Sequence, residues 1–224
     1  MKRVSDINFT FRDDIVALLK MYAKHKDLEK GRKLHADILQ QKLLEKDMYL
    51  SNALISLYAK CGELETANQV FDEFQYQDVV SWNAIITCYS QNGFADEVMH
   101  FFNQMRTEGF APNAITFCSV FKACGSLGYI DVGEHLHTEA ARQGLLEHNV
   151  VLGTSLVDMY ARLGLLVKAQ GVFDGLSSRN VVSWNALIAG YVRHGLGKNA
   201  LKCFLQMREK GITPNEVTFI VVLK

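Results

Sequence analysis

The chain has 224 residues, 49% of them hydrophobic, and its 24 lysines and arginines balance its 24 aspartates and glutamates. A net charge of zero excludes the overall basic character of many nucleic-acid-binding proteins, so any basic surface must be local. The five cysteines are widely spaced and include no C-x-x-C pair, so the sequence indicates neither a disulfide framework nor a zinc site and is typical of a reducing compartment. It has no run of eighteen apolar residues, and we expect a soluble chain without membrane contact.

The chain is an internal duplication that follows a short N-terminal extension, residues 1–11. Residues 12–113 align without a gap to residues 114–215, with about a third of the positions identical. The segment VVSWNAIITCYSQNG from Val79 returns as VVSWNALIAGYVRHG from Val181, and QMRTEGFAPN returns as QMREKGITPN. The extension has neither the apolar core of a signal peptide nor the character of an organelle transit peptide.

Each copy of 102 residues subdivides into three repeats of 36, 31 and 35 residues. Residues 216–224 match the beginning of the fourth repeat and therefore open a seventh, truncated repeat. The six complete repeats are residues 12–47, 48–78, 79–113, 114–149, 150–180 and 181–215.

Each repeat is predicted to form two helices. In repeat 79–113, apolar residues recur at helical spacing from Trp82 to Tyr89, Gly93 ends that helix, and a second apolar stripe runs from Val98 to Met105. Two helices of this size cannot bury both stripes alone, so neighbouring repeats must stack. We predict an all-α fold, a right-handed α-solenoid of helix-turn-helix repeats with a concave groove. The aromatic residues expected in its core are Tyr58, Trp82, Tyr89, Tyr160, Trp184 and Tyr191.

The repeat lengths and three motifs resemble the pentatricopeptide repeat (PPR) family. The motifs are W-N-A-I-I-x-x-Y, the Leu-Val-Asp-Met-Tyr-Ala-Arg run from Leu156, and Q-M-R-x-x-G-x-x-P-N. The order 36, 31, 35 is similar to the plant-type PLS subclass, in which long, short and standard motifs alternate. The alternative is the peptide-binding tetratricopeptide repeat, but Ile86 and Ile188 stand where that family has glycine, and its 34-residue period does not give 31 and 36.

Positions 2, 5, 9 and 13 of a repeat are three or four residues apart and form one stripe on its first helix. In the PPR family, position 5 and the last residue of a repeat choose one RNA base. The resemblance implies that Asn–Asp favours uracil, Asn–Asn a pyrimidine with cytosine preferred, and Thr–Asn adenine, which gives 5′-n-U-Y-n-A-Y-3′. The alternative is that these polar residues only cap helices or form turns. The base-specifying pairs are Asn52 with Asp78, Asn83 with Asn113, Thr154 with Asn180, and Asn185 with Asn215, whereas the long repeats, with Val16 and Asp47 or Cys118 and Asn149, fit no known pair.

Two further positions are candidates for RNA contacts. Position 2 is apolar in most repeats, as base stacking requires, although packing between repeats explains it equally well; the residues are Tyr49, Val80, Ile115, Val151 and Val182. Position 13 carries Lys24, Lys60, Arg162 and Arg193. These cations can contact RNA phosphates, or they can simply favour a helix C-terminus.

The sequence contains no convincing catalytic, metal-binding or cofactor motif. His137 and Glu139 reproduce half of the zinc deaminase signature, but no P-C-x-x-C follows them, and His35 recurs without the glutamate. We therefore interpret His137 as structural, expect no cofactor, and predict that the chain is not an enzyme.

The predicted function is sequence-specific binding of single-stranded RNA. Relatives of the PLS subclass are mostly plastid or mitochondrial proteins that select sites of C-to-U editing, so the resemblance implies such a role in a longer protein. The transit peptide and a deaminase-like domain or editing-complex partner would then lie outside this chain. Splicing and transcript protection are the alternatives. Exposed apolar residues near Phe219 and Val222 in the truncated repeat also favour self-association.

Overall fold

The computed structural model describes residues 9–43, 47–74 and 77–223, so most of the predicted N-terminal extension and Lys224 lie outside the described residues. These residues form thirteen helices and no strand, which confirms the all-α fold class. The chain divides into two compact halves, Met1–Pro112 and Asn113–Lys224. Their boundary lies one residue from the junction of the two sequence copies.

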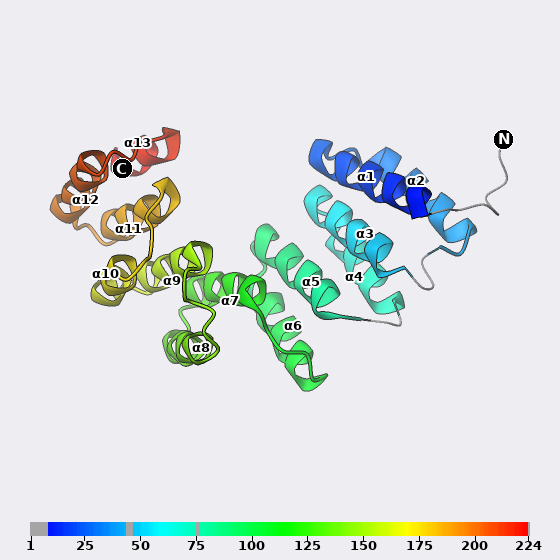
Figure 1. Ribbon diagram of the computed structural model, residues 1–224, viewed down its shortest axis with the longest axis horizontal. Helices are drawn as coiled ribbons and strands as arrows, with labels where there is room; N and C mark the ends of the chain where they lie inside the picture. Colours follow the sequence, from blue (N-terminus) through cyan, green and yellow to red (C-terminus); the bar gives the residue numbers. More distant parts are fainter. Residues whose placement is uncertain (1–8, 44–46, 75–76, 224) are drawn as a thin grey trace. The chain divides into compact units, whose positions relative to one another are not determined.

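The first half contains three helix pairs (Figure 1). The first helices of successive repeats pack directly on one another, α1 on α3 and α3 on α5, and each second helix packs on the first helix of its own repeat. Helix α1 begins at Phe9, three residues before the predicted start of the first repeat. The helices are α1 (Phe9–His25), α2 (Leu28–Gln40), α3 (Met48–Cys61), α4 (Leu64–Glu73), α5 (Val79–Asn92) and α6 (Ala95–Thr107).

The second half repeats this arrangement and adds one short helix. Its first helices pack in the order α7, α9, α11 and α13. Its helices are α7 (Ala114–Leu127), α8 (Ile130–Arg142), α9 (Val150–Arg162), α10 (Leu166–Asp174), α11 (Val181–Arg193), α12 (Gly197–Glu209) and α13 (Glu216–Val222). No helix among the described residues combines the length and the apolar character needed to cross a membrane.

The turn within a repeat depends on glycine. Gly93 and Gly195 follow the first helices of the two standard repeats, with φ angles of 84° and 72°. This left-handed conformation lets the chain reverse at the helix C-terminus, and glycine adopts it without the steric cost of a side chain. Helices α6 and α12 then return along α5 and α11.

The aromatic core is the same in both halves. Trp82 meets Phe71 edge-to-face at 4.8 Å between ring centroids, and the corresponding pair, Trp184 and Phe173, does so at 4.6 Å. Such geometry is favoured by the ring quadrupoles. The prediction of buried aromatic residues is confirmed for both tryptophans and for Tyr58, Tyr160 and Tyr191. Only Tyr89 is half-buried, and it stacks on Phe101.

A histidine–tyrosine hydrogen bond links each long repeat to the short repeat that follows. His35 Nδ1 lies 2.8 Å from the Tyr58 hydroxyl, and His137 Nδ1 lies 2.8 Å from the Tyr160 hydroxyl. Burial lowers the pKa of both histidines and raises the pKa of Tyr160 to about 12. His137 therefore connects α8 to α9. The recurrence of a histidine, His35, at the equivalent place of the first repeat indicates such a structural role.

Acidification should therefore weaken both links. Because burial holds the folded pKa of His35 and His137 below the ordinary value of 6.5, the unfolded chain takes up protons first as the pH falls. The contribution of the two buried histidines to the free energy of unfolding should thus be complete above pH 6.5. It should decrease as the pH falls towards their folded pKa. Urea denaturation between pH 7.5 and 5.5 measures this decrease.

The matched variants for this measurement are His35→Gln with His137→Gln, and His135→Gln at an exposed position of α8. The double variant should show a flatter pH dependence, whereas His135→Gln should follow the parent. Equal slopes for the parent and the double variant would contradict the prediction.

Close packing of α9 on α11 depends on Gly190. A Cβ atom added there would lie 2.6 Å from the Cβ atom of Ala161, which is fixed to the backbone of α9. Gly190→Ala should therefore lower the free energy of unfolding by about 1–3 kcal/mol. Gly171→Ala is the control, because an added Cβ meets nothing within 4 Å in α10, and it should raise stability by roughly 0.5–1 kcal/mol. Thermal unfolding of the two variants checks the opposite signs.

Candidate nucleic-acid interface

The last residue of every complete repeat caps the first helix of the next repeat. Asp78 Oδ1 accepts a hydrogen bond from the backbone N–H of Ser81 at 2.8 Å, and Asn180 Oδ1 accepts from Val182 and Ser183 at 2.9 and 3.1 Å. Capping is thus a real role of these residues, as the alternative interpretation of the sequence holds. The remaining caps are Asp47, Asn113, Asn149 and Asn215.

Capping decides what each last residue can present to a ligand. One side-chain oxygen is engaged by the helix N-terminus, so an asparagine keeps its NH2 group and an aspartate keeps its second oxygen. An asparagine at this position therefore offers hydrogen-bond donors where an aspartate offers an acceptor. Asn180 and Asn215 are also exposed, while Asp78 is half-buried.

In the last complete repeat the two base-specifying candidates contact each other. Asn185 Nδ2 donates to Asn215 Oδ1 at 3.1 Å, and the same oxygen accepts from the backbone N–H and the hydroxyl of Thr218, both at 3.0 Å. Three donors on one oxygen fix the orientation of the Asn215 amide. Its NH2 group is consequently directed away from the cap.

The position-5 side chains are less open than the sequence predicts. Asn83 and Asn185 expose only 6% and 8% of their surface, and Asn52 and Thr154 are half-buried. The physical reason is that the first helices of neighbouring repeats pack directly on one another, which leaves position 5 beside the contact. Asn83 belongs to the first half and its predicted partner Asn113 to the second half. The contacts of each residue are therefore given within its own half.

Three of these position-5 side chains have a buried oxygen without a hydrogen-bond partner. The atoms are Asn52 Oδ1, Thr154 Oγ1 and Asn185 Oδ1. Buried polar atoms are nearly always paired, and an unpaired one costs about 1–3 kcal/mol. Position 5 thus has an unsatisfied hydrogen-bonding atom in three of the repeats.

Residues of the predicted stripe line a hollow of about 370 Å³ in the second half. Thr154 and Asn185 line it at position 5, and Val182 and Val217 line it at position 2. Cys118 and Lys122 of α7 and Asp158 of α9 complete its polar wall. Four consecutive first helices therefore contribute to a single surface.

In each half, the residues at position 2 are exposed apolar side chains that recur from one first helix to the next. Their exposed fractions lie between 53% for Val217 and 69% for Val151. Side chains with this exposure are accessible to a ligand, and packing between repeats covers less than half of their surface. The others are Tyr49, Val80, Ile115 and Val182, and the first repeat alone has a charged residue, Asp13, at this position.

The cations at position 13 fall into two groups. In the first half, Lys24 and Lys60 line one hollow of about 460 Å³ together with Lys26 and Gln91. In the second half, Arg162 Nε lies 2.7 Å from Asp158 Oδ2, so its charge is already compensated, while Arg193 is exposed. Lys26 and the ion pair were not predicted from the sequence, although the spacing i, i+4 between Asp158 and Arg162 is a signal for the ion pair.

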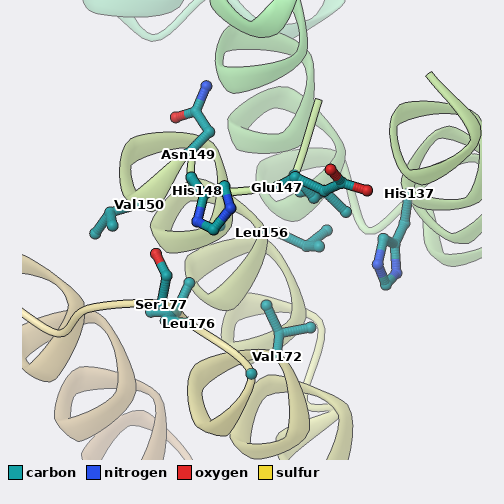
Figure 2. A pocket seen from close by; sticks show the side chains of 12 residues that line it. His137, Glu147, His148, Asn149, Val150, Leu156, Val172, Leu176 and Ser177 are labelled. Carbon is teal, nitrogen blue, oxygen red and sulfur yellow. The ribbon is translucent and has the colours of Figure 1, made fainter. Parts of the chain in front are cut away.

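A third hollow, of about 450 Å³, lies between the α8–α9 loop and the end of α10 (Figure 2). His148 and Glu147 come from the loop and His137 from α8, and the apolar Leu156 and Val172 lie among them. The part of the chain that the structure describes holds no group of three or more metal-ligating side chains. The lining combines the titratable His137, Glu147 and His148 with mainly apolar side chains.

Comparison with known sequences decides the family. The profile described as PPR repeat family matches residues 77–126 and 179–224, and that described as PPR repeat matches residues 49–79 and 154–181. The chain belongs to the pentatricopeptide repeat family. Two relatives from Arabidopsis thaliana are the pentatricopeptide repeat-containing proteins At1g18485, 39% identical over 93% of this chain, and At3g24000, mitochondrial, 41% identical over 90%. The chain spans only 21% and 32% of their lengths.

Solved structures share the fold. The pentatricopeptide repeat protein PPR10 in complex with an 18-nucleotide psaJ RNA element superimposes on 93% of this PPR chain with a TM-score of 0.77, at 20% identity and over 32% of PPR10. The PPR domain of Arabidopsis thaliana protein-only RNase P 1, in complex with tRNA, matches 84% of this chain and 96% of that domain with a TM-score of 0.57 and 15% identity. These likenesses confirm the predicted α-solenoid of helix-turn-helix repeats.

The capping role of the last residue can be measured without RNA. Asn180→Ala removes the acceptor for two backbone N–H groups of α11 and should lower the free energy of unfolding by about 1 kcal/mol. Asn180→Asp retains an acceptor at the positive end of the helix and should leave stability nearly unchanged. Chemical denaturation of the parent and both variants tests this order, and an Asn180→Ala variant as stable as the parent would contradict it.

Proposed function

We propose that this PPR chain binds single-stranded RNA sequence-specifically, at one base per repeat, with the core 5′-n-U-Y-n-A-Y-3′. The observation that carries the proposal is the recurrence, in successive repeats, of a polar pair beside an exposed apolar side chain. The pair can form hydrogen bonds with the edge of a base while the apolar residue contacts its face. The sequence resemblance to base-reading PPR proteins supplies the assignment of bases.

The donor and acceptor pattern explains how Asn and Asp differ at the last position. Uracil has a donor, N3–H, at the centre of its pairing edge, and the second oxygen of Asp78 is an acceptor for it. Cytosine and adenine have an acceptor nitrogen there, and the NH2 groups of Asn215 and Asn180 are donors. Asp78 therefore suits uracil, and the two asparagines suit cytosine and adenine.

Selection between a pyrimidine and a purine then rests on position 5. Thr154 in the short repeat is shorter than Asn185 in the standard repeat, so it leaves more room for the larger adenine ring beside Asn180. The unpartnered Thr154 hydroxyl can also donate to a base nitrogen or accept from an amino group. This division agrees with adenine for Thr–Asn and a pyrimidine for Asn–Asn.

The row of position-2 side chains favours single-stranded RNA. Bases can be sandwiched between apolar side chains of neighbouring repeats only when they are unpaired and unstacked, because in a duplex their faces are already covered. Valine and tyrosine provide such contacts for any base. The row would thus contribute affinity, and the polar pairs would contribute specificity.

Phosphate contacts at position 13 complete the proposal. Lys24, Lys26 and Lys60 gather at one hollow of the first half, which provides the local positive charge that a net charge of zero hides. Arg193 is available in the second half. Arg162 would have to give up part of its pairing with Asp158 and should contribute less.

The known relatives support RNA processing in an organelle as the wider role. PPR10 and protein-only RNase P 1 are named in complexes with RNA and tRNA, and related proteins are named chloroplastic or mitochondrial. We propose that the whole protein selects a site for C-to-U editing in a plastid or mitochondrion, with PLS-type repeats and with the chemistry supplied outside this chain. Splicing and transcript protection are the alternatives that use the same RNA-binding surface.

A two-residue exchange tests the base assignment. Thr154→Asn with Asn180→Asp gives the fifth repeat the pair found at Asn52 and Asp78, so its preference at the fifth nucleotide should change from adenine to uracil. Each preference should amount to about tenfold in Kd. Fluorescence anisotropy with four RNAs that differ only at that nucleotide measures it.

Two controls accompany this experiment. The parent should bind the RNA duplex at least tenfold more weakly than the single strand, as stacking by position 2 requires. The double variant should keep the parental preference for uracil at the second nucleotide. An unchanged preference at the fifth nucleotide would refute the assignment, and equal binding of duplex and single strand would refute the mode of binding.

A further inference from the structure

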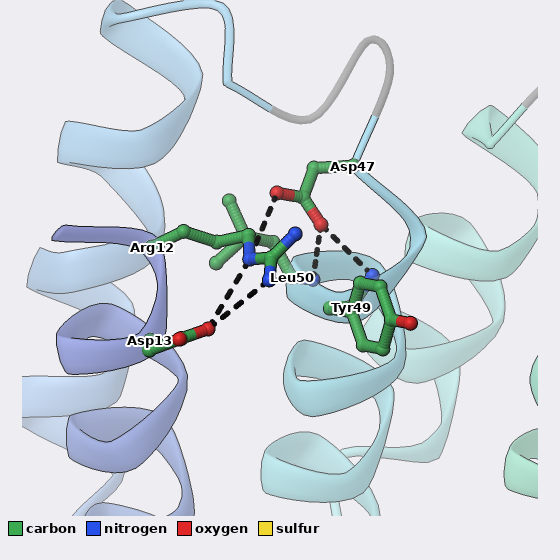
Figure 3. Close-up of polar contacts among 5 residues, drawn as sticks. All are labelled: Arg12, Asp13, Asp47, Tyr49 and Leu50. Carbon is green, nitrogen blue, oxygen red and sulfur yellow. Dashed lines mark hydrogen bonds and ion pairs between the residues drawn. The ribbon is translucent and has the colours of Figure 1, made fainter. Parts of the chain in front are cut away.

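Arg12 contacts three residues, Asp13, Asp47 and Tyr49, at the beginning of the first repeat (Figure 3). Its guanidinium donates to Asp13 Oδ1 from Nε at 3.3 Å and from Nη2 at 3.2 Å, and Nε lies 3.9 Å from Asp47 Oδ2. The guanidinium carbon also lies 4.8 Å from the centre of the Tyr49 ring. Asp47 Oδ1 meanwhile caps α3 through the N–H groups of Tyr49 and Leu50.

These residues occupy the positions that surround a base in the other repeats. Asp13 is position 2 of the first repeat and Asp47 is its last residue, while Tyr49 is position 2 of the second repeat. A base read by the first repeat would lie against Asp47 and between the two position-2 residues. The planar guanidinium of Arg12 lies in contact with all three.

We propose that Arg12 fills the base slot of the first repeat from within the protein, so that this repeat reads no base. The inference rests on the proposed one-base-per-repeat binding. It leaves the first nucleotide of the proposed core unread, so that base reading within these repeats begins at the uracil assigned to Asn52 and Asp78. The six complete repeats would thus read five bases.

The contacts make displacement by a base unfavourable. A guanidinium that lies over a tyrosine ring has a cation–π attraction to it, and its planar group has the flat shape of a base. The side chains of Arg12 and Asp47 are only 23% and 22% exposed, so water screens their attraction only in part. An incoming base would also leave the carboxylates of Asp13 and Asp47 without a cation beside the RNA.

The second copy of the repeat provides an internal comparison. Ala114 corresponds to Arg12, Ile115 to Asp13, Asn149 to Asp47 and Val151 to Tyr49. Alanine cannot reach across the slot, and Ile115 and Val151 expose 57% and 69% of their surface. The fourth repeat therefore retains an open slot of the ordinary kind, with an asparagine at its edge.

The experiment uses RNAs in which one nucleotide has lost its base. For the parent, an abasic first nucleotide should bind as tightly as the intact RNA, and an abasic fourth nucleotide should weaken binding about tenfold, since each stacked base contributes measurably. Arg12→Ala with Asp13→Ile gives the first repeat the first two residues of the fourth. In this variant an abasic first nucleotide should also weaken binding about tenfold.

The reciprocal variant keeps the inference falsifiable if the first one fails to fold. Ala114→Arg with Ile115→Asp, Asn149→Asp and Val151→Tyr gives the fourth slot all four residues of the first, so this slot should be filled and an abasic fourth nucleotide should no longer matter. If the parent loses affinity for RNA with an abasic first nucleotide, Arg12 does not fill the slot and the inference is wrong. If no RNA is bound by any of the proteins, the proposed function fails and this inference fails with it.

Discussion

The structure depends on the packing of first helix on first helix from one repeat to the next. A single repeat leaves an apolar stripe on each of its two helices, and only a neighbour can cover the first of them. In the first half α1, α3 and α5 pack in this way, and in the second half α7, α9, α11 and α13 do. This contact brings the beginning of each first helix, the cap before it and the position-2 side chain after it into the same register in every repeat.

Capping and the proposed base recognition can share one side chain because they use different atoms of it. A helix N-terminus needs an acceptor oxygen, which both aspartate and asparagine provide. The second polar group of the same side chain is left over, and it is a donor in Asn180 and an acceptor in Asp78. A sequence can therefore exchange Asn for Asp without losing the helix while it changes the hydrogen-bonding character of the surface. The same residue can therefore cap a helix and still present a polar group to a ligand.

The sequence was sufficient for features that repeat, and insufficient for those that depend on one local contact. Periodicity predicted the helix pairs, and the W-N-A motif predicted the buried tryptophans, because these features follow from the 102-residue duplication. The low exposure of Asn83 and Asn185 could not be predicted, since spacing gives the side of a helix but not the distance to its neighbour. The cluster of Arg12 with Tyr49 was missed because its residues are 37 positions apart and have no counterpart in the second copy.

The low exposure of position 5 agrees with a role in recognition once the unpaired oxygens are considered. A side chain selected only for packing at this depth would be apolar, as Val16 is in the first repeat, because apolar replacement removes the cost of an unpaired polar atom. Asn52, Thr154 and Asn185 instead carry that cost in three repeats. These unpaired oxygens occur in repeats that the pairing rule assigns to a base. Val16 belongs to the first repeat, whose slot is filled by Arg12. Asn52, Thr154 and Asn185 thus combine low exposure with a polar group that a ligand can pair with, whereas the long repeats carry Val16 and Cys118 at position 5.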